Sequence, residues 1–133
     1  MNADEADSLV GKPYEAGSYG PDSFNCWGLL YYAQRNYFGV KMPKAPIGDA
    51  DKCRLMFESR IQSGQWSETA QPKHGDGALM RGGTDPHVGI YLEFDGGGIL
   101  HSMEGVGVIF TTLDQLRTLG FARTKYYRLT NDS

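Results

Sequence analysis

The chain has 133 residues and a mass of 14.7 kDa, the size of one domain, and we expect residues 1–133 to form a single domain. Hydrophobic residues make up 40% and charged ones 22%, which excludes a disordered chain, and no apolar run approaches the roughly 20 residues of a membrane span. The net charge of −3 gives no basic footprint for nucleic acid.

The first half of the chain carries helical patterns. Residues 4–10 predict a short helix anchored by Leu9 and Val10, and the stretch 11–24, rich in Gly, Pro, Ser and Asp, predicts a loop. A second amphipathic helix is predicted further on, over residues 49–64, and its inward side chains would be Leu55, Met56 and Ile61.

Between these elements, apolar residues recur at helical spacing over residues 26–39. Ser23 or Asn25 is placed to cap the start of this helix, and Gly39 is placed to end it. The helix would therefore begin at Cys26, directly after a glycine-rich loop.

After Gly64 the hydrophobic period changes to two. A short helix is expected over residues 113–119, entered from Thr112 and stopped by Gly120. Helices followed by hairpin-linked strands indicate an α+β fold with an antiparallel sheet. The predicted strands are 66–70, 78–80, 87–94, 99–103, 106–112 and 121–129.

Cys26 is the candidate nucleophile. Two cysteines, Cys26 and Cys53, are too few for a disulfide scaffold, and we favour two free thiols, with Cys53 structural within its helix. A buried, inert thiol is the ordinary outcome for a free cysteine. At a helix N-terminus, however, unpaired N–H groups and the helix dipole favour an anion, so a lowered thiol pKa is expected here, and the same N–H groups can receive an oxyanion.

A thiol nucleophile needs a base, and His87 is the candidate. It shares one face of its strand with Gly89, which leaves room for the Cys26 helix to pack there. His101 follows after a DGGG turn, so a hairpin can set the two imidazoles side by side and let His101 orient His87. The alternative is two unrelated surface histidines; His74, at a turn, is expected to be solvated.

These residues together carry a resemblance to a known family. Tyr14, SFNCWGLL, GDGALM, HVGIYL and ILHSMEGVGV, in this order, resemble the NlpC-type family of papain-like cysteine peptidases, bacterial and phage enzymes that cut peptidoglycan stem peptides. The resemblance runs from about residue 12 to residue 108. It implies a papain-like core, in which the nucleophile helix packs on an antiparallel sheet of about five to six strands.

The resemblance also implies roles for individual residues. Cys26 resembles the nucleophile, His87 the general base and acid, and His101 the orienting third residue. Tyr14 resembles the tyrosine that helps the oxyanion site; its alternative is a loop aromatic packing on the core. Trp27 and Asn25, which flank the cysteine, are the remaining candidates for oxyanion or substrate binding, and no cofactor or metal is implied.

The resemblance is strongest to the phage tail-assembly branch, and one position departs from the family. The family usually has Asp before the nucleophile, where this chain has Asn25, so a charge beside the thiol is lost. The implied activity is a D-glutamyl–diamino acid endopeptidase acting on stem peptides, phage tail-associated or prophage-encoded. The alternatives are an inactive tail-assembly protein of the same fold and a secreted toxin-type cell-wall amidase.

The expected partners are the stem-peptide substrate and phage tail proteins, with no nucleic acid and no membrane. The acidic first residues lack the apolar core of a signal peptide, so we expect synthesis in the cytoplasm and action at the cell wall as a virion component. A zinc site made of Cys26, His87 and His101 is the weaker alternative, because the spacing resembles no usual zinc motif.

Overall fold

The computed structural model describes residues 1–42, 58–64, 66–81, 87–121 and 123–129. Cys53, Leu55 and Met56, which the sequence assigns to a helix over residues 49–64, lie outside these residues. The helices are α1 (Ala3–Leu9), α2 (Cys26–Ala33), a π-helical turn η1 (Gln34–Phe38), a 3₁₀ turn η2 (Phe94–Gly96) and α4 (Leu113–Leu116). The strands are β1 (Trp66–Thr69), β2 (Gly77–Arg81), β3 (His87–Leu92), β4 (Gly98–Met103), β5 (Gly107–Thr112) and β6 (Arg123–Leu129).

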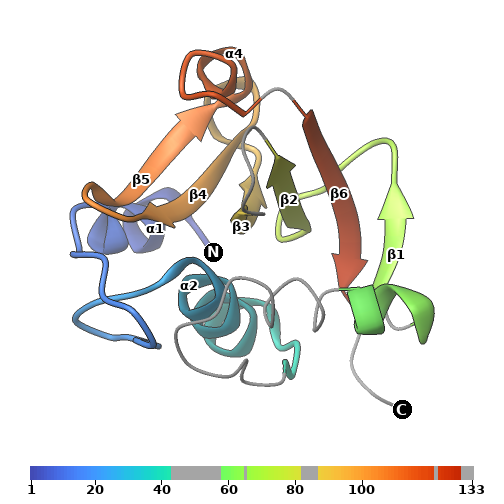
Figure 1. Ribbon diagram of the computed structural model, residues 1–133, viewed down its shortest axis with the longest axis horizontal. Coiled ribbons are helices and arrows are strands. Elements are labelled where there is room, and N and C mark those ends of the chain that lie inside the picture. Colours follow the sequence, from blue (N-terminus) through green and yellow to red (C-terminus); the bar gives the residue numbers. More distant parts are fainter. Residues whose placement is uncertain (43–57, 65, 82–86, 122, 130–133) are drawn as a thin grey trace.

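The six strands form one sheet in the order β1-β6-β2-β3-β4-β5, and every pair is antiparallel. The predicted α+β class is confirmed. Strands β2 to β5 are consecutive neighbours, as hairpin connections require, whereas β6 returns to lie between β1 and β2. In Figure 1, α2 lies below the sheet and α4 lies above it, so the two helices cover different parts of the sheet.

The main core lies between α2 and the sheet. Trp27, Leu29 and Leu30 of α2 are fully buried and belong to one cluster with Val88 and Ile90 of β3. The helix therefore packs on the Val88 face of β3 and not on the Gly89 face, so that part of the prediction is wrong. The strand pattern could not distinguish the faces, because both faces of β3 are buried.

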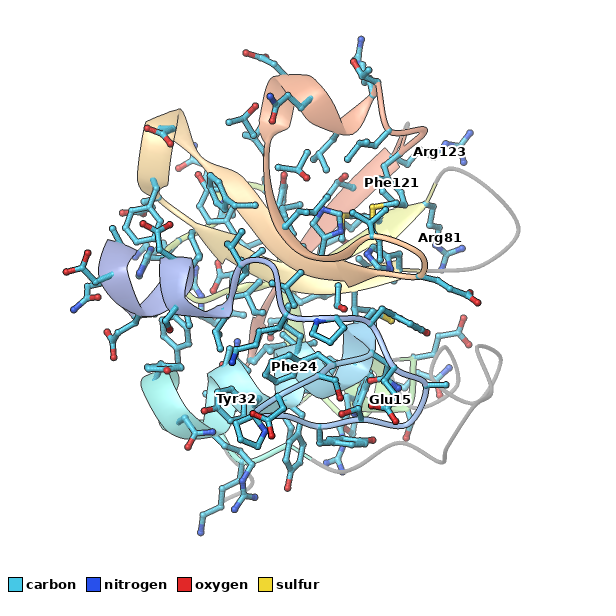
Figure 2. The ribbon with its side chains drawn as sticks, turned by 90° about the vertical axis from the view of Figure 1, so that its left-hand side faces the viewer. Glu15, Phe24, Tyr32, Arg81, Phe121 and Arg123 are labelled. Atoms are coloured by element: carbon cyan, nitrogen blue, oxygen red, sulfur yellow. The ribbon has the colours of Figure 1, made fainter. Side chains whose placement is uncertain are left out.

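The opposite face of the sheet carries a smaller cluster. Ala78, Met80 and Ile99 are fully buried there, and Leu116 of α4 closes the cluster. Gly89 faces this side, where an added Cβ would lie 2.6 Å from Ile99 Cγ2 and 3.0 Å from the Cβ of His101. Its missing side chain therefore makes room for strand β4. Figure 2 shows Phe24 and Tyr32 on the α2 side of the molecule and Phe121 on the other side.

The start of α2 is fixed by a side-chain cap and by a close contact. Asn25 is the N-cap, and its Oδ1 accepts from the Gly28 N–H at 2.6 Å, which confirms one of the two predicted caps. A Cβ at Gly28 would lie 2.0 Å from the Ser18 carbonyl oxygen, so the preceding loop packs directly on the first turn. At the far end the helix widens into η1 and stops at Gly39, which has a φ of 69°.

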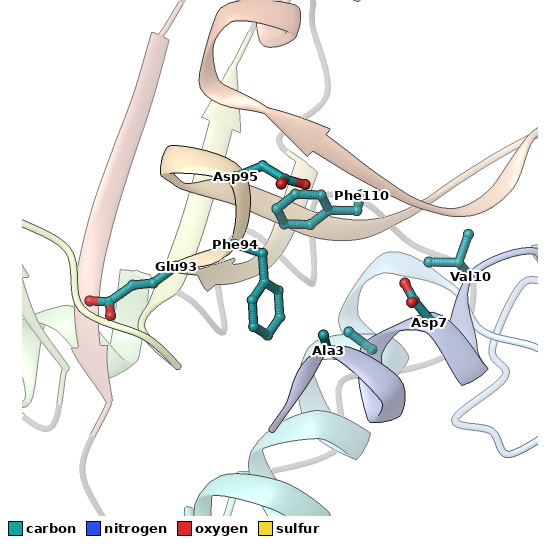
Figure 3. Close-up of a pocket in the computed structure, with 8 residues that line it drawn as sticks. Ala3, Asp7, Val10, Glu93, Phe94, Asp95 and Phe110 are labelled. Carbon is teal, nitrogen blue, oxygen red and sulfur yellow. The ribbon is translucent and has the colours of Figure 1, made fainter.

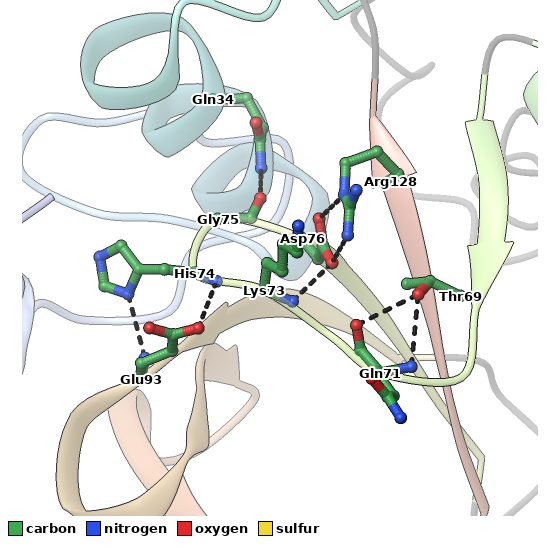
Figure 4. Close-up of polar contacts among 9 residues, drawn as sticks. All are labelled: Gln34, Thr69, Gln71, Lys73, His74, Gly75, Asp76, Glu93 and Arg128. Carbon is green, nitrogen blue, oxygen red and sulfur yellow. Dashed lines mark hydrogen bonds and ion pairs between the residues drawn. The ribbon is translucent and has the colours of Figure 1, made fainter.

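The start of β2 is held by a buried carboxylate. Asp76 is 3% exposed, and its two oxygens accept from the Arg128 guanidinium of β6 at 2.6 and 3.1 Å (Figure 4). One oxygen also accepts from the Lys73 N–H at 2.8 Å, and the Gln34 amide donates to the Gly75 carbonyl nearby. The turn before β2 is thus tied both to β6 and to the end of α2.

The sequence suggested that His74 is solvated, but in the structure its ring has several contacts. Its Nδ1 accepts from the Glu93 N–H at 3.0 Å, and its Nε2 lies 2.6 Å from the Met1 carbonyl. The ring also has edge contacts with Phe38 and Phe94. The ring therefore connects the N-terminus to the end of β3. These contacts join distant parts of the chain, so a short sequence pattern cannot predict them.

The remaining predicted helices are present in part. In α1, Leu9 is buried as expected, but Val10 is 42% exposed and is not an anchor. Residues 58–62 are helical, and Ile61 is partly buried against the main core, as predicted. Within the described part of the chain, no helix is long and apolar enough to cross a bilayer.

Candidate active site

Cys26 is the first residue of α2 and is half-buried. The segment before it pairs with an upstream segment, because the Phe24 N–H donates to the Pro13 carbonyl and the Glu15 N–H donates to the Phe24 carbonyl. Tyr14 and Phe24 form a parallel bridge between these segments. The predicted oxyanion tyrosine is thus attached, through its backbone, two residues before the thiol.

The thiol lies where strands β3 and β4 separate. Their ladder runs from Leu92–Gly98 to Ile90–Leu100. If the register continued, Gly89 would face His101, and Val88 and Ser102 would form the next hydrogen-bonded pair. The Tyr91 N–H points to β2, where it donates to the Asp76 carbonyl, so the Val88 N–H points to the β4 side.

Both residues of this pair contact the segment that contains the start of α2. The Ser102 hydroxyl donates to the Phe24 carbonyl at 2.8 Å, and the Val88 backbone N–H lowers the pKa of the Cys26 thiol. The segment that leads into α2 is therefore inserted into the end of the sheet, next to the residue that follows His87.

Two effects on the thiol pKa oppose each other, and burial is the larger. Burial raises the pKa of Cys26 above its ordinary value, while the backbone N–H groups of Val88, Trp27 and Cys26 lower it. The expected lowering by the helix terminus is present but is outweighed, so the expected net direction is wrong. At neutral pH the resting group is the thiol, and a base is needed to produce the thiolate.

Two histidines and a threonine form a hydrogen-bonded row across three strands. His87 Nε2 lies 2.8 Å from His101 Nδ1, and His101 Nε2 lies 2.8 Å from Thr111 Oγ1. His101 is fully buried and Thr111 is 3% exposed. In the β4–β5 register His101 pairs with Ile109 and Ile99 pairs with Thr111, so Thr111 is the diagonal neighbour of His101 on the same face. The alternative of two unrelated surface histidines is thereby wrong.

Burial keeps both imidazoles neutral. It lowers the pKa of His87 to about 4. It also lowers the pKa of His101 to about 3, with a further contribution from the charge that His87 would carry. Phe121 stacks on the His87 ring at a centroid distance of 5.3 Å and an angle of 10°, and its edge meets His101. At neutral pH His87 therefore has the protonation state that a general base requires.

The residues that flank the thiol have distinct structural roles. Trp27 is fully buried and stacks on Trp66 at 5.9 Å, so its ring is not available to a substrate, and that expectation is corrected. Its backbone N–H nevertheless lowers the pKa of the Cys26 thiol. Asn25 uses its Oδ1 for the helix cap. Tyr14 is partly buried in the loop beside Phe24, and its oxyanion role stays a prediction.

Thr111, Ser102 and Phe121 were not singled out by sequence reasoning. Thr111 could have been found, because the short turn between β4 and β5 fixes their register and places it beside His101. Ser102 and Phe121 act through contacts that no short sequence window contains.

A cavity of about 450 Å³ lies elsewhere, between α1 and the β3–β4 connection (Figure 3). Its lining includes Asp7, Val10, Phe94, Asp95 and Phe110, and it contains neither the thiol nor the two imidazoles of the row. Among the described residues, no three His, Cys, Asp or Glu side chains are grouped to hold a metal ion. The cavity is therefore separate from the candidate chemical groups, which are the Cys26 thiol and the His87–His101 pair.

A thiol at the start of a helix that packs on an antiparallel sheet carrying a buried histidine pair is typical of the papain-like class of fold. The chain matches the NlpC/P60 family over residues 11–123 and belongs to that family. The recognition made from the sequence motifs is confirmed; its phage tail branch stays a prediction.

Individual relatives are similar over different parts of their lengths. The chain is 31% identical over 87 residues to murein DD-endopeptidase MepH of Escherichia coli K12, covering 62% of this chain and only 29% of that protein. The NlpC/p60 domain of the peptidoglycan hydrolase SagA is similar in structure, with a TM-score of 0.61, 24% identity and 92% of both chains covered. NlpC2 of Trichomonas vaginalis has a TM-score of 0.64 at 19% identity, covering 96% of this chain and 45% of that one. Both structures share the fold of this chain.

Proposed function

We propose that this protein is a cysteine endopeptidase that hydrolyses an amide bond in peptidoglycan stem peptides. The observation that carries the proposal is the position of Cys26 at the start of α2, where the backbone N–H of Val88, the residue after a neutral, buried histidine, lowers the pKa of the thiol. Family membership and the names of the relatives, a murein endopeptidase and a peptidoglycan hydrolase, support this class of substrate.

In the proposed reaction the Cys26 sulfur attacks the amide carbonyl carbon while His87 takes the thiol proton. His87 uses Nδ1 for this step, since its Nε2 is hydrogen-bonded to His101 Nδ1. The oxyanion is held by N–H groups at the start of α2, with Tyr14 as the candidate side-chain donor. His87 then protonates the leaving amine, and water attacks the thioester with His87 again as the base, which regenerates the thiol and releases the acid.

The proposed bond is the one between D-glutamate and the diamino acid of the stem peptide. The relative's name indicates a second candidate, the D,D bond of a cross-link. Un-cross-linked muropeptides contain only the first of these bonds, whereas cross-linked dimers contain both. Mass spectrometry of the products from the two substrates therefore identifies the bond directly.

The test uses wild type and Cys26→Ala with both muropeptide types. We expect wild type to cleave the un-cross-linked peptide, with fragment masses that correspond to cleavage after D-glutamate, and the variant to give no product. Products from cross-linked dimers alone would replace the proposed bond with the D,D bond. Equal product from wild type and variant would remove Cys26 from the mechanism.

A further inference from the structure

The hydrogen-bonded row continues past the two histidines to a threonine on the next strand. Thr111 lies at its far end, on β5, and its Oγ1 is 2.8 Å from His101 Nε2. Both side chains are buried, so their polar atoms depend on each other for hydrogen bonds. A valine has nearly the shape of threonine and would fill the same space, which makes the hydroxyl the distinctive feature of this position.

Proton counting shows why the hydroxyl matters. A neutral imidazole carries one ring proton, and each hydrogen bond in the row uses one proton. If Thr111 accepts from His101 Nε2–H, then His101 Nδ1 accepts from His87 Nε2–H, and His87 Nδ1 carries no proton. If Thr111 donates instead, both rings are protonated on Nδ1, and His87 cannot take a proton there. The direction of the bond at Thr111 therefore decides whether His87 is a base toward Cys26.

We propose that Thr111 is a positioning residue that accepts the hydrogen bond from His101 Nε2 and thereby keeps His87 Nδ1 open for the thiol proton. Without an acceptor, a proton on His101 Nε2 would be buried and unpaired, which disfavours that tautomer. The pair would then shift to the tautomers that place both protons on Nδ1. The inference rests on the proposed function only in that it takes His87 as the base.

The test measures tautomers directly, without substrate. Nitrogen-15 NMR of histidine-labelled protein at pH 7 distinguishes protonated from unprotonated ring nitrogens, and His87→Gln and His101→Gln assign the signals. We expect wild type and Thr111→Ser to carry the proton on Nε2 of both rings, and Thr111→Val to carry it on Nδ1. A wild-type proton on Nδ1 of His101 would overturn the inference, and this result needs no variant at Thr111 to fold.

A second readout connects the tautomer to the thiol. We expect Thr111→Val to slow iodoacetamide alkylation of Cys26 at pH 7 by about tenfold or more, and Thr111→Ser to stay within about twofold of wild type. Thermal unfolding of both variants controls for general loss of structure. A folded Thr111→Val protein with wild-type tautomers and rates would contradict the role. Correct tautomers without muropeptide cleavage would instead contradict the proposed function alone.

Discussion

At the scale of single residues, burial disfavours the thiolate form of Cys26, while nearby backbone N–H groups favour that form. The pKa of Cys26 is raised by burial and lowered by three backbone N–H groups. His87 is neutral because its own pKa is lowered to about 4. The thiol and the imidazole are therefore both uncharged at rest, and in the proposed reaction charge develops only as the sulfur attacks.

Asn25 gives the first residue-scale prediction. Asn25→Ala removes the acceptor of the Gly28 N–H and should lower the free energy of unfolding by about 1 kcal/mol. Asn25→Asp keeps an acceptor at the cap and restores the residue usual in the family, so its stability should stay within about 0.5 kcal/mol of wild type. Urea unfolding of the three proteins is the measurement, and equal destabilisation by both substitutions would contradict the capping role.

At the scale of elements, α2 is positioned by close backbone packing. The Ser18 carbonyl lies against Gly28, and the Asn25 N–H donates to the same carbonyl at 3.0 Å. The Ser102 hydroxyl donates to the carbonyl of Phe24, the residue just before Asn25. The sulfur at the helix start is therefore held by the loop on one side and by the sheet on the other.

Gly28→Ala tests this packing. The added methyl would clash with the Ser18 backbone, which has no side-chain rotamer to change, so we expect a loss of about 1–3 kcal/mol together with displacement of the helix start. Gly39→Ala is the matched control for steric packing, because no atom lies within 4 Å of an added Cβ there, although its φ of 69° adds backbone strain. Unfolding and Cys26 alkylation are measured together. Slower alkylation in the control than in Gly28→Ala would contradict the packing account.

The sequence predicted elements well and their mutual placement less well. Period and capping are local, so α2 with its Asn25 cap and the succession of strands could be predicted. Both faces of β3 are buried, so the pattern could not show that α2 packs on the Val88 face. The return of β6 between β1 and β2 and the burial of the thiol likewise depend on contacts between distant parts of the chain.

At the scale of the whole molecule, the buried histidines couple stability to pH. Histidine takes up a proton near pH 6.5 in an unfolded chain, but His101 does so only near pH 3 in the folded protein. Between these values the unfolded state binds more protons, so stability falls as pH falls, by about 1.4 kcal/mol per pH unit for each such group.

His101→Gln tests the coupling, because it removes one titrating group and keeps every carboxylate. Between pH 7 and pH 5, wild type should lose about 1–2 kcal/mol more unfolding free energy than the variant does. The comparison is between the two pH dependences, so the general cost of the substitution cancels. Urea unfolding at both pH values gives the numbers, and parallel losses in the two proteins would refute the depressed pKa of His101.

The most direct test of the central claim, that His87 is the base for Cys26, is the alkylation rate of Cys26 against pH in wild type and His87→Gln. Peptide mapping separates the Cys26 adduct from that of Cys53. The account predicts that wild type reacts about tenfold faster or more at pH 7 and that the two rates converge at high pH, where hydroxide removes the thiol proton without the imidazole. Equal rates at pH 7 in two folded proteins would contradict it.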